Sequence, residues 1–119
     1  MAPETLDDLD KFAAAVTPRT RAILLCNPGN PTGAVYSREA LVEVLALCRE
    51  RGLTLIADEV YREFVYTGQA PLSVMTLPGA EDSVVVVDSL SKRFSACGAR
   101  IGCLLTKSKE LMDAATRFA

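Results

Sequence analysis

The sequence predicts a single α/β domain: a three-layer sandwich with a mostly parallel sheet, helices on both faces and one antiparallel strand. Two observations support this. The 119 residues are the length of one domain, and 50% of them are hydrophobic and 24% charged, as in a globular protein. Short unbroken apolar runs also alternate with amphipathic helical segments, which is typical of a parallel sheet.

The first predicted element is a helix. Its apolar residues recur at helical spacing between residues 6 and 16. Thr5 is a suitable N-cap, and Pro18 ends the helix because proline lacks the amide donor that a helix needs.

Two strands with a helix between them follow. Residues 22–26 and 53–57 are short apolar runs, typical of strands that are covered on both faces. Ser37 can cap the intervening helix, and Gly52 provides its C-terminal stop. The apolar stripe of this helix consists of Leu41, Val44, Leu45 and Cys48.

The second half of the chain predicts a loop over residues 67–82, strands at 84–87 and 101–105, and a helix from about Ser108. Only thirteen residues, 88–100, separate the two strands, and a connection of this length is short for a helical crossover between parallel strands. The fourth strand is therefore predicted to be antiparallel.

Composition excludes several classes of function. There are 13 basic and 15 acidic residues without a basic cluster, which argues against a nucleic-acid partner. No apolar run approaches the ~20 residues of a membrane span. The start, Met1 to Glu4, lacks the pattern of a signal peptide, so a cytoplasmic location is expected.

The cysteines and the lack of histidine restrict the chemistry. The chain has no Cys-x-x-Cys spacing, so its cysteines are predicted to be reduced and buried: Cys26, Cys48, Cys97 and Cys103. The absence of histidine excludes a His-based triad, metal site or general base on this chain. Catalysis must use lysine, carboxylates, tyrosine or a cofactor.

Lys92 is the strongest candidate for chemistry. It ends Ser89-Leu90-Ser91-Lys92, just past the apolar run at 84–87, where a lysine can be held desolvated, lose its proton and form a Schiff base with an aldehyde. Ser89 and the later Arg100 offer donors suited to a phosphate. An aldehyde and a phosphate on one small molecule indicate pyridoxal 5'-phosphate.

Residues 27–33 (NPGNPTG) contain two Asn-Pro pairs. The simpler interpretation is a strand-to-helix turn, which Asn, Pro and Gly favour. The functional interpretation, which we prefer, is that Pro31 fixes the chain so that Asn30 points its amide at a ligand oxygen. We also predict that the Asn30–Pro31 peptide bond is cis, because the chain must turn sharply there.

Asp58, Glu59 and Tyr61 follow the second apolar strand. An apolar strand that ends in Asp-Glu also describes the Walker B element of nucleotide hydrolases, but the required phosphate loop is not found in this sequence. In open α/β sheets, ligands bind outside the carboxyl ends of the strands. Residues 27–33, Asp58 and Ser89–Lys92 are therefore expected to converge on one rim.

Together, these motifs resemble fold-type I pyridoxal-phosphate enzymes, specifically the class I and II aminotransferase family. The resemblance rests on residues 27–33, Asp58–Tyr61, Ser89–Lys92 and Gly98–Gly102, in the family's order and approximate spacing. It implies that Lys92 forms the Schiff base and then carries the proton between the substrate α-carbon and the cofactor. It also implies that Asp58 pairs with the ring nitrogen and keeps it protonated.

The resemblance assigns four further cofactor contacts. Tyr61 and Asn30 would donate to the cofactor's 3'-oxygen, with Tyr61 also counted among the catalytic residues. Ser89 and Arg100 would bind the phosphate. Glu59 receives no chemical role and is expected to be structural.

Members of this family are longer than 119 residues. The resemblance therefore implies that residues 1–119 are part of the large, pyridoxal-phosphate-binding domain, without its N-terminal part and without the small substrate domain. The parent enzyme is expected to be a homodimer in amino acid metabolism or biosynthesis, acting on an amino acid and a 2-oxo acid. The isolated chain is expected not to turn over substrate.

Three alternatives remain open from the sequence. A carbon–sulfur β-lyase or related α-carbon enzyme would use the same residues. A regulatory module with this fold would lack catalysis, although the basic N-terminal extension of such transcription factors is not seen here. A fragment that binds no cofactor is the third.

Overall fold

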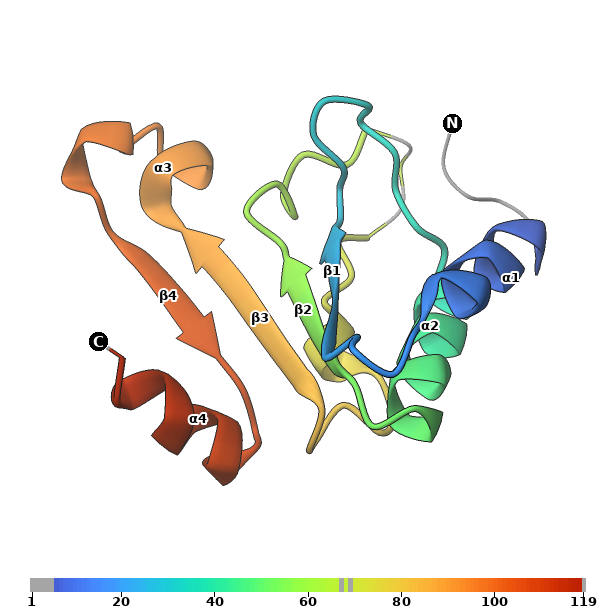
Figure 1. The fold of residues 1–119 in the computed structure, drawn as a ribbon. Coiled ribbons are helices and arrows are strands. Elements are labelled where there is room, and N and C mark those ends of the chain that lie inside the picture. The colour runs from blue at the N-terminus through green and yellow to red at the C-terminus, as the bar shows by residue number, and fades with distance from the viewer. Residues whose placement is uncertain (1–5, 67, 69, 119) are drawn as a thin grey trace.

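The computed structural model describes residues 6–66, 68 and 70–118. Four strands form one sheet in the order β1 (Ala22–Cys26), β2 (Thr54–Asp58), β3 (Val84–Ser89) and β4 (Gly102–Leu105) (Figure 1). β1, β2 and β3 are parallel, whereas β4 is antiparallel to β3. The predicted α/β class and the antiparallel fourth strand are confirmed.

Three of the described helices also begin and end near the predicted signals, whereas the single helical turn at residues 90–93 was not predicted. The helices are α1 (Leu6–Ala15), α2 (Arg38–Glu50), the single-turn α3 (Leu90–Arg93) and α4 (Lys109–Thr116), with 3₁₀ turns η1 (Val74–Thr76) and η2 (Cys97–Ala99). Ser37 caps α2 because its hydroxyl oxygen accepts a hydrogen bond from the Ala40 amide at 3.1 Å. Gly52 follows α2 with a φ of +63°, a conformation that glycine adopts without a Cβ clash. The predicted cap Thr5 lies outside the described residues.

The hydrophobic core lies between α2, η1 and one face of the sheet. On this face Ile23 and Leu25 of β1, Leu55 and Ala57 of β2, and Val84 and Val86 of β3 are buried. The predicted stripe of α2 packs against them, and all four of its residues are buried: Leu41, Val44, Leu45 and Cys48. Val74 of η1 completes the same core.

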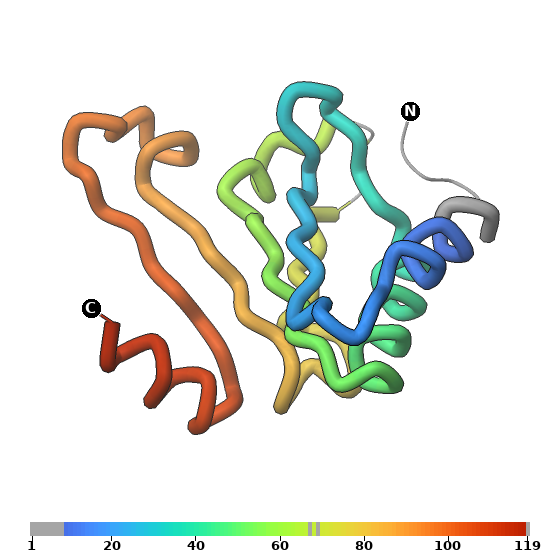
Figure 2. The backbone as a smooth tube through the Cα atoms, in the orientation of Figure 1, coloured from blue at the N-terminus to red at the C-terminus, as the bar shows by residue number. Residues whose placement is uncertain are grey.

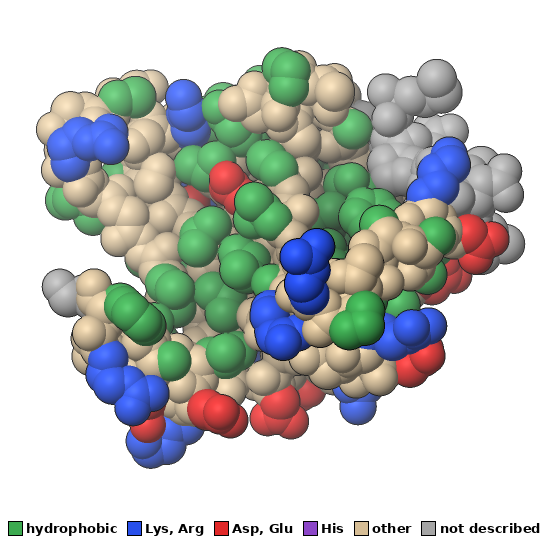
Figure 3. Space-filling model, viewed as in Figure 1, with side chains coloured by type: hydrophobic (Ala, Val, Ile, Leu, Met, Phe, Trp, Pro, Cys, Tyr) green, Lys and Arg blue, Asp and Glu red, His purple; other side chains and the backbone are tan. Residues whose placement is uncertain are grey.

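The other face of the sheet, on which helices were also expected, is open at β1. On this face Leu24 of β1 is 72% exposed, whereas Val85 of β3 is 8% exposed. Figure 3 shows hydrophobic side chains gathered over the sheet on the side turned to the viewer. The reason is topological. Successive right-handed crossovers that run in one direction place their connections on the same face, and β3 joins β4 without a helical crossover.

The cysteines correct one prediction. Cys48 is buried as expected, and burial raises the pKa of its thiol to about 11. Cys26 is half-buried, whereas Cys97 and Cys103 are exposed. Cys97 lies in η2, outside the core, and Cys103 lies on the edge strand β4, whose residues are all exposed. All four thiols are free.

Within the described ranges, no helix is both long enough and apolar enough to cross a membrane.

Candidate functional site

The carboxyl ends of the three parallel strands lie at the same level. Cys26 is in register with Asp58, and Asp58 is in register with Val87. The Asn27 amide donates to the Asp58 carbonyl at 3.0 Å, and the Glu59 amide donates to the Val87 carbonyl at 3.0 Å. The segments that follow these strands therefore emerge at one end of the sheet (Figures 1 and 2), as the sequence predicted.

The loop after β1 is held by its own hydrogen bonds. Asn27 is only 3% exposed, and its side-chain oxygen accepts a hydrogen bond from the Tyr36 amide at 2.9 Å. The Gly33 amide donates to the Gly29 carbonyl at 2.7 Å. The Asn30–Pro31 bond is cis, which confirms the prediction, and the Asn27–Pro28 bond is also cis, which was not predicted.

Three of the predicted site residues meet directly. The Asn30 amide Nδ2 donates to the Tyr61 hydroxyl at 3.2 Å, so the loop after β1 contacts the turn after β2. Lys92 Nζ lies over the Tyr61 ring, 5.6 Å from its centroid, within the range of a cation–π contact. Phe64 packs edge-on against the same ring, with the two centroids 6.0 Å apart.

Asp58 lies beside these residues at the end of β2. Its carboxylate is half-buried, and Oδ1 accepts a hydrogen bond from the Val60 amide at 3.1 Å. This bond fixes the start of the turn that carries Tyr61. The carboxylate thus belongs to the same rim as Asn30 and Tyr61.

The two predicted phosphate ligands flank Lys92 along the chain but make local contacts. The Ser89 hydroxyl oxygen accepts a hydrogen bond from the Ser91 amide at 3.2 Å and thereby caps α3. Arg100 is exposed, has a left-handed φ of +54°, and donates from Nη1 to the Cys97 carbonyl at 3.3 Å. The structure therefore brings Asn30, Tyr61 and Lys92 into contact, whereas Ser89 and Arg100 contact their own turns.

Lys92 is exposed, contrary to the expectation that it would be desolvated. The physical reason is its position on α3, a single turn beyond the end of β3, where no described segment covers the amine. The aromatic face of Tyr61 is the contact that the described part of the chain provides for it.

Glu59 has the structural position that was expected. Its side chain is 1% exposed, and Oε1 accepts a hydrogen bond from the Val74 amide at 2.8 Å. Burial raises the pKa of this carboxyl, although hydrogen bonds from the Val74 amide and the Ser73 hydroxyl and the charge of Arg62 act in the opposite direction. Glu59 therefore ties the end of β2 to η1.

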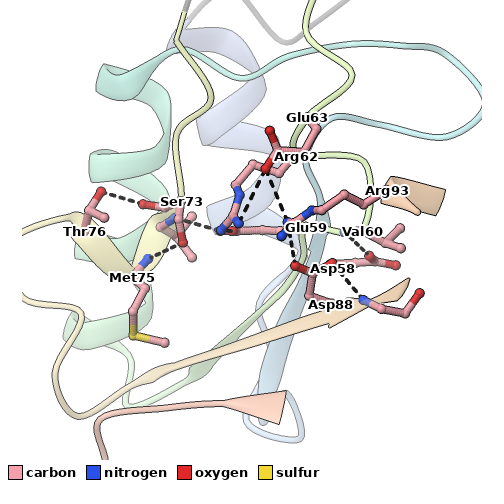
Figure 4. A network of polar contacts seen from close by, with 12 residues as sticks. Asp58, Glu59, Val60, Arg62, Glu63, Ser73, Met75, Thr76, Asp88 and Arg93 are labelled. Carbon is pink, nitrogen blue, oxygen red and sulfur yellow. Dashed lines mark hydrogen bonds and ion pairs between the residues drawn. The ribbon is translucent and has the colours of Figure 1, made fainter. Parts of the chain in front are cut away.

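A set of ion pairs lies near the rim, and it was not predicted from the sequence. It joins three residues after β2 to one residue of β3 and one of α3: Glu59, Arg62, Glu63, Asp88 and Arg93 (Figure 4). The one local signal was the spacing of Glu59 and Arg62 by three positions. Among the described residues no group of three His, Cys, Asp or Glu side chains could hold a metal ion.

Comparison with known proteins identifies the family. The profile of the family "Aminotransferase class I and II" matches residues 4–119. The chain therefore belongs to the class I and II aminotransferase family, whose members use pyridoxal 5'-phosphate.

Two relatives illustrate the similarity. Kynurenine–oxoglutarate transaminase 1 of Homo sapiens is 40% identical over 100 residues, which cover 84% of this chain and 24% of the relative. Glutamate-pyruvate aminotransferase AlaA of Escherichia coli strain K12 is 40% identical over 99 residues, which cover 82% of this chain and 24% of the relative. The chain thus spans about a quarter of the length of these curated relatives.

Solved structures agree on the fold. A Thermus thermophilus aspartate aminotransferase double mutant superposes with a TM-score of 0.82 at 34% identity, covering 90% of this chain and 27% of that one. An aminotransferase from Escherichia coli gives a TM-score of 0.79 at 38% identity, covering 85% and 25%. The mostly parallel sheet with its antiparallel strand is consistent with part of the large domain of such enzymes.

Proposed function

We propose that the protein to which this chain belongs is a pyridoxal 5'-phosphate-dependent aminotransferase. It would transfer the amino group of an amino acid to a 2-oxo acid. The observation that carries the proposal is the meeting of Asn30, Tyr61 and Lys92 next to Asp58, at the carboxyl ends of adjacent parallel strands.

The side chains at this rim fit the chemical groups of the cofactor. Lys92 offers an exposed amine for an aldehyde, and Asp58 offers a carboxylate for a protonated ring nitrogen. Tyr61 and Asn30 offer a hydroxyl and an amide for the 3'-oxygen, and their mutual hydrogen bond of 3.2 Å already directs them to one place. When bound, pyridoxal 5'-phosphate supplies an electron sink for the negative charge that develops at the substrate α-carbon.

The phosphate contacts require a rearrangement of hydrogen bonds. Ser89 keeps its hydroxyl proton free to donate, because only its oxygen is used in capping α3. Arg100 would exchange its bond to the Cys97 carbonyl, at 3.3 Å, for a charge-assisted bond to phosphate.

Each residue then has a distinct task in the reaction. Lys92 would hold and move the proton at the substrate α-carbon. Asp58 would keep the ring nitrogen protonated and so stabilise the transition state electrostatically. Tyr61 would limit where the Lys92 amine can lie, because its ring lies beneath Nζ.

The wider setting is part of the same proposal. Residues 1–119 would form part of the large cofactor-binding domain of a homodimeric enzyme of amino acid biosynthesis or metabolism in the cytoplasm. We propose that the chain alone does not turn over substrate, because it spans about a quarter of its relatives.

The test is a transamination assay on the whole protein with amino acid and 2-oxo acid panels. Lys92→Ala should abolish transfer. The matched control is Lys109→Ala, which removes an exposed lysine on α4 that pairs with Asp113. Full activity in Lys92→Ala, or no transfer in the unaltered protein with any pair of substrates, would contradict the proposal.

A further inference from the structure

Arg93 lies at the centre of the ion pairs between the two segments of the site. Its Nη2 atom is 2.8 Å from Asp88 Oδ2 and 3.4 Å from Glu63 Oε1. Glu63 Oε1 is also 3.8 Å from Arg62 Nη2. Figure 4 shows Glu63 next to Arg62 and Arg93 extending toward Asp88.

These charged residues are sequence neighbours of the site residues. Glu63 follows Tyr61 by two positions, and Arg93 follows Lys92 directly. The ion pair between Glu63 and Arg93 therefore joins the turn that carries Tyr61 to the helical turn that carries Lys92.

Both ends of this connection are fixed to the sheet. Asp88 belongs to β3, its side chain is 12% exposed, and Oδ1 accepts a hydrogen bond from the Ser89 amide at 2.7 Å. On the other side, Arg62 pairs at 3.4 Å with Glu59, whose side chain is 1% exposed and anchored to the Val74 amide. Because Asp88 and Arg93 are partly shielded from water, their attraction is screened less than that of an exposed pair.

Few other contacts with the described residues hold the Lys92 amine in place. Its amine is exposed, its four-carbon stem is flexible, and its contact across the rim is with the Tyr61 ring. The orientation of α3 therefore decides where the amine lies, and Arg93 holds α3 to both Asp88 and Glu63.

We propose that Arg93 and Glu63 are positioning residues that hold the Lys92 amine over the Tyr61 ring. They act through the backbone of their own segments and contact no reacting atom. Their purpose in catalysis rests on the proposed function, whereas the geometry that they impose can be measured without cofactor or substrate.

The experiment is NMR of the 119-residue chain with labelled lysine. Protons above an aromatic ring are shifted upfield, so the Lys92 ε-methylene signals report its distance from Tyr61. Tyr61→Leu gives the signal position without the ring. Glu63→Gln and Arg93→Gln remove each charge, and Asp113→Asn, which breaks the exposed pair with Lys109 on α4, is the matched control.

Both Gln variants should lose most of the upfield shift and approach the Tyr61→Leu signal, while Asp113→Asn retains it. Glu63 is 47% exposed, so Glu63→Gln preserves the fold even if Arg93→Gln does not, and the amide spectrum of each variant verifies this. An unchanged upfield shift in folded Glu63→Gln would overturn the proposal.

A second readout separates this proposal from the proposed function. Pyridoxal 5'-phosphate is added to the whole protein, the C=N bond that it forms with lysine is reduced with borohydride, and the labelled lysines are mapped. Loss of selectivity for Lys92 in Glu63→Gln supports positioning, and undiminished selectivity contradicts it. If the unaltered whole protein shows no selectivity for Lys92, the proposed cofactor role fails, and the NMR result still decides the positioning role.

Discussion

Asp58 and Glu59 are adjacent in the sequence, but their carboxylates lie in different surroundings. Glu59 is 1% exposed and accepts a hydrogen bond from the Val74 amide, on the core side of the sheet. Asp58 is half-buried at the rim, next to the turn of Tyr61. One residue therefore stabilises the fold, and the other is available to a ligand.

This difference predicts how stability depends on pH. Burial raises the pKa of Glu59 in the folded state above the ordinary value of 4.5, so the folded protein holds this proton more tightly than the unfolded chain does. The contribution of Glu59 is therefore fully present below pH 4.5 and is lost as the pH rises through the higher folded pKa.

The comparison is with Glu59→Gln, which cannot titrate but keeps an acceptor oxygen for Val74. Denaturant unfolding from acidic to neutral pH should show the unfolding free energy of the unaltered chain falling relative to that of Glu59→Gln. A relative stability that rises with pH would mean that the hydrogen bonds to the carboxylate outweigh its desolvation.

Asp58 has a chemical prediction instead. In the whole protein, Asp58→Asn should lower kcat by about 10²-fold, the effect of removing one preorganised electrostatic contact. The dissociation constant for pyridoxal 5'-phosphate should change by less than about tenfold, since the phosphate contacts remain. Turnover assays and cofactor titration measure the two quantities, and equal losses in both would show that the role is misassigned.

Two neighbouring leucines on β1 test which side of this strand faces the core. Leu25 is 2% exposed and Leu24 is 72% exposed, although both belong to one apolar run. Leu25→Ala should cost about 2–5 kcal/mol of unfolding free energy. Leu24→Ala should change it by no more than about 0.5 kcal/mol, as at other surface positions. Similar losses at the two positions in urea unfolding would show that the second face is covered in solution.

These leucines also show which features of the fold a local sequence pattern predicts and which it does not. The strand at 22–26 is evident from its apolar run, and Ser37 and Gly52 mark the limits of α2 because caps are local chemistry. Which face of the strand is covered depends on the course of the crossovers, and a local pattern does not contain that information.

For the candidate site, too, some features could be predicted from the sequence and others could not. The gathering of Asn30, Asp58, Tyr61 and Lys92 at one rim could be predicted, because they lie at or just after strand ends that a parallel sheet must bring together. The exposure of Lys92 and the pairing of Glu63 with Arg93 could not. Both depend on how two separate turns are oriented, and no periodicity specifies that orientation.

We propose above that Lys92 is the residue that binds the cofactor aldehyde. The most direct measurement is borohydride reduction of the whole protein with pyridoxal 5'-phosphate, followed by peptide mapping. We expect a label on Lys92 that is lost in Lys92→Ala. A label on Lys11, Lys107 or Lys109 in place of Lys92 would contradict it.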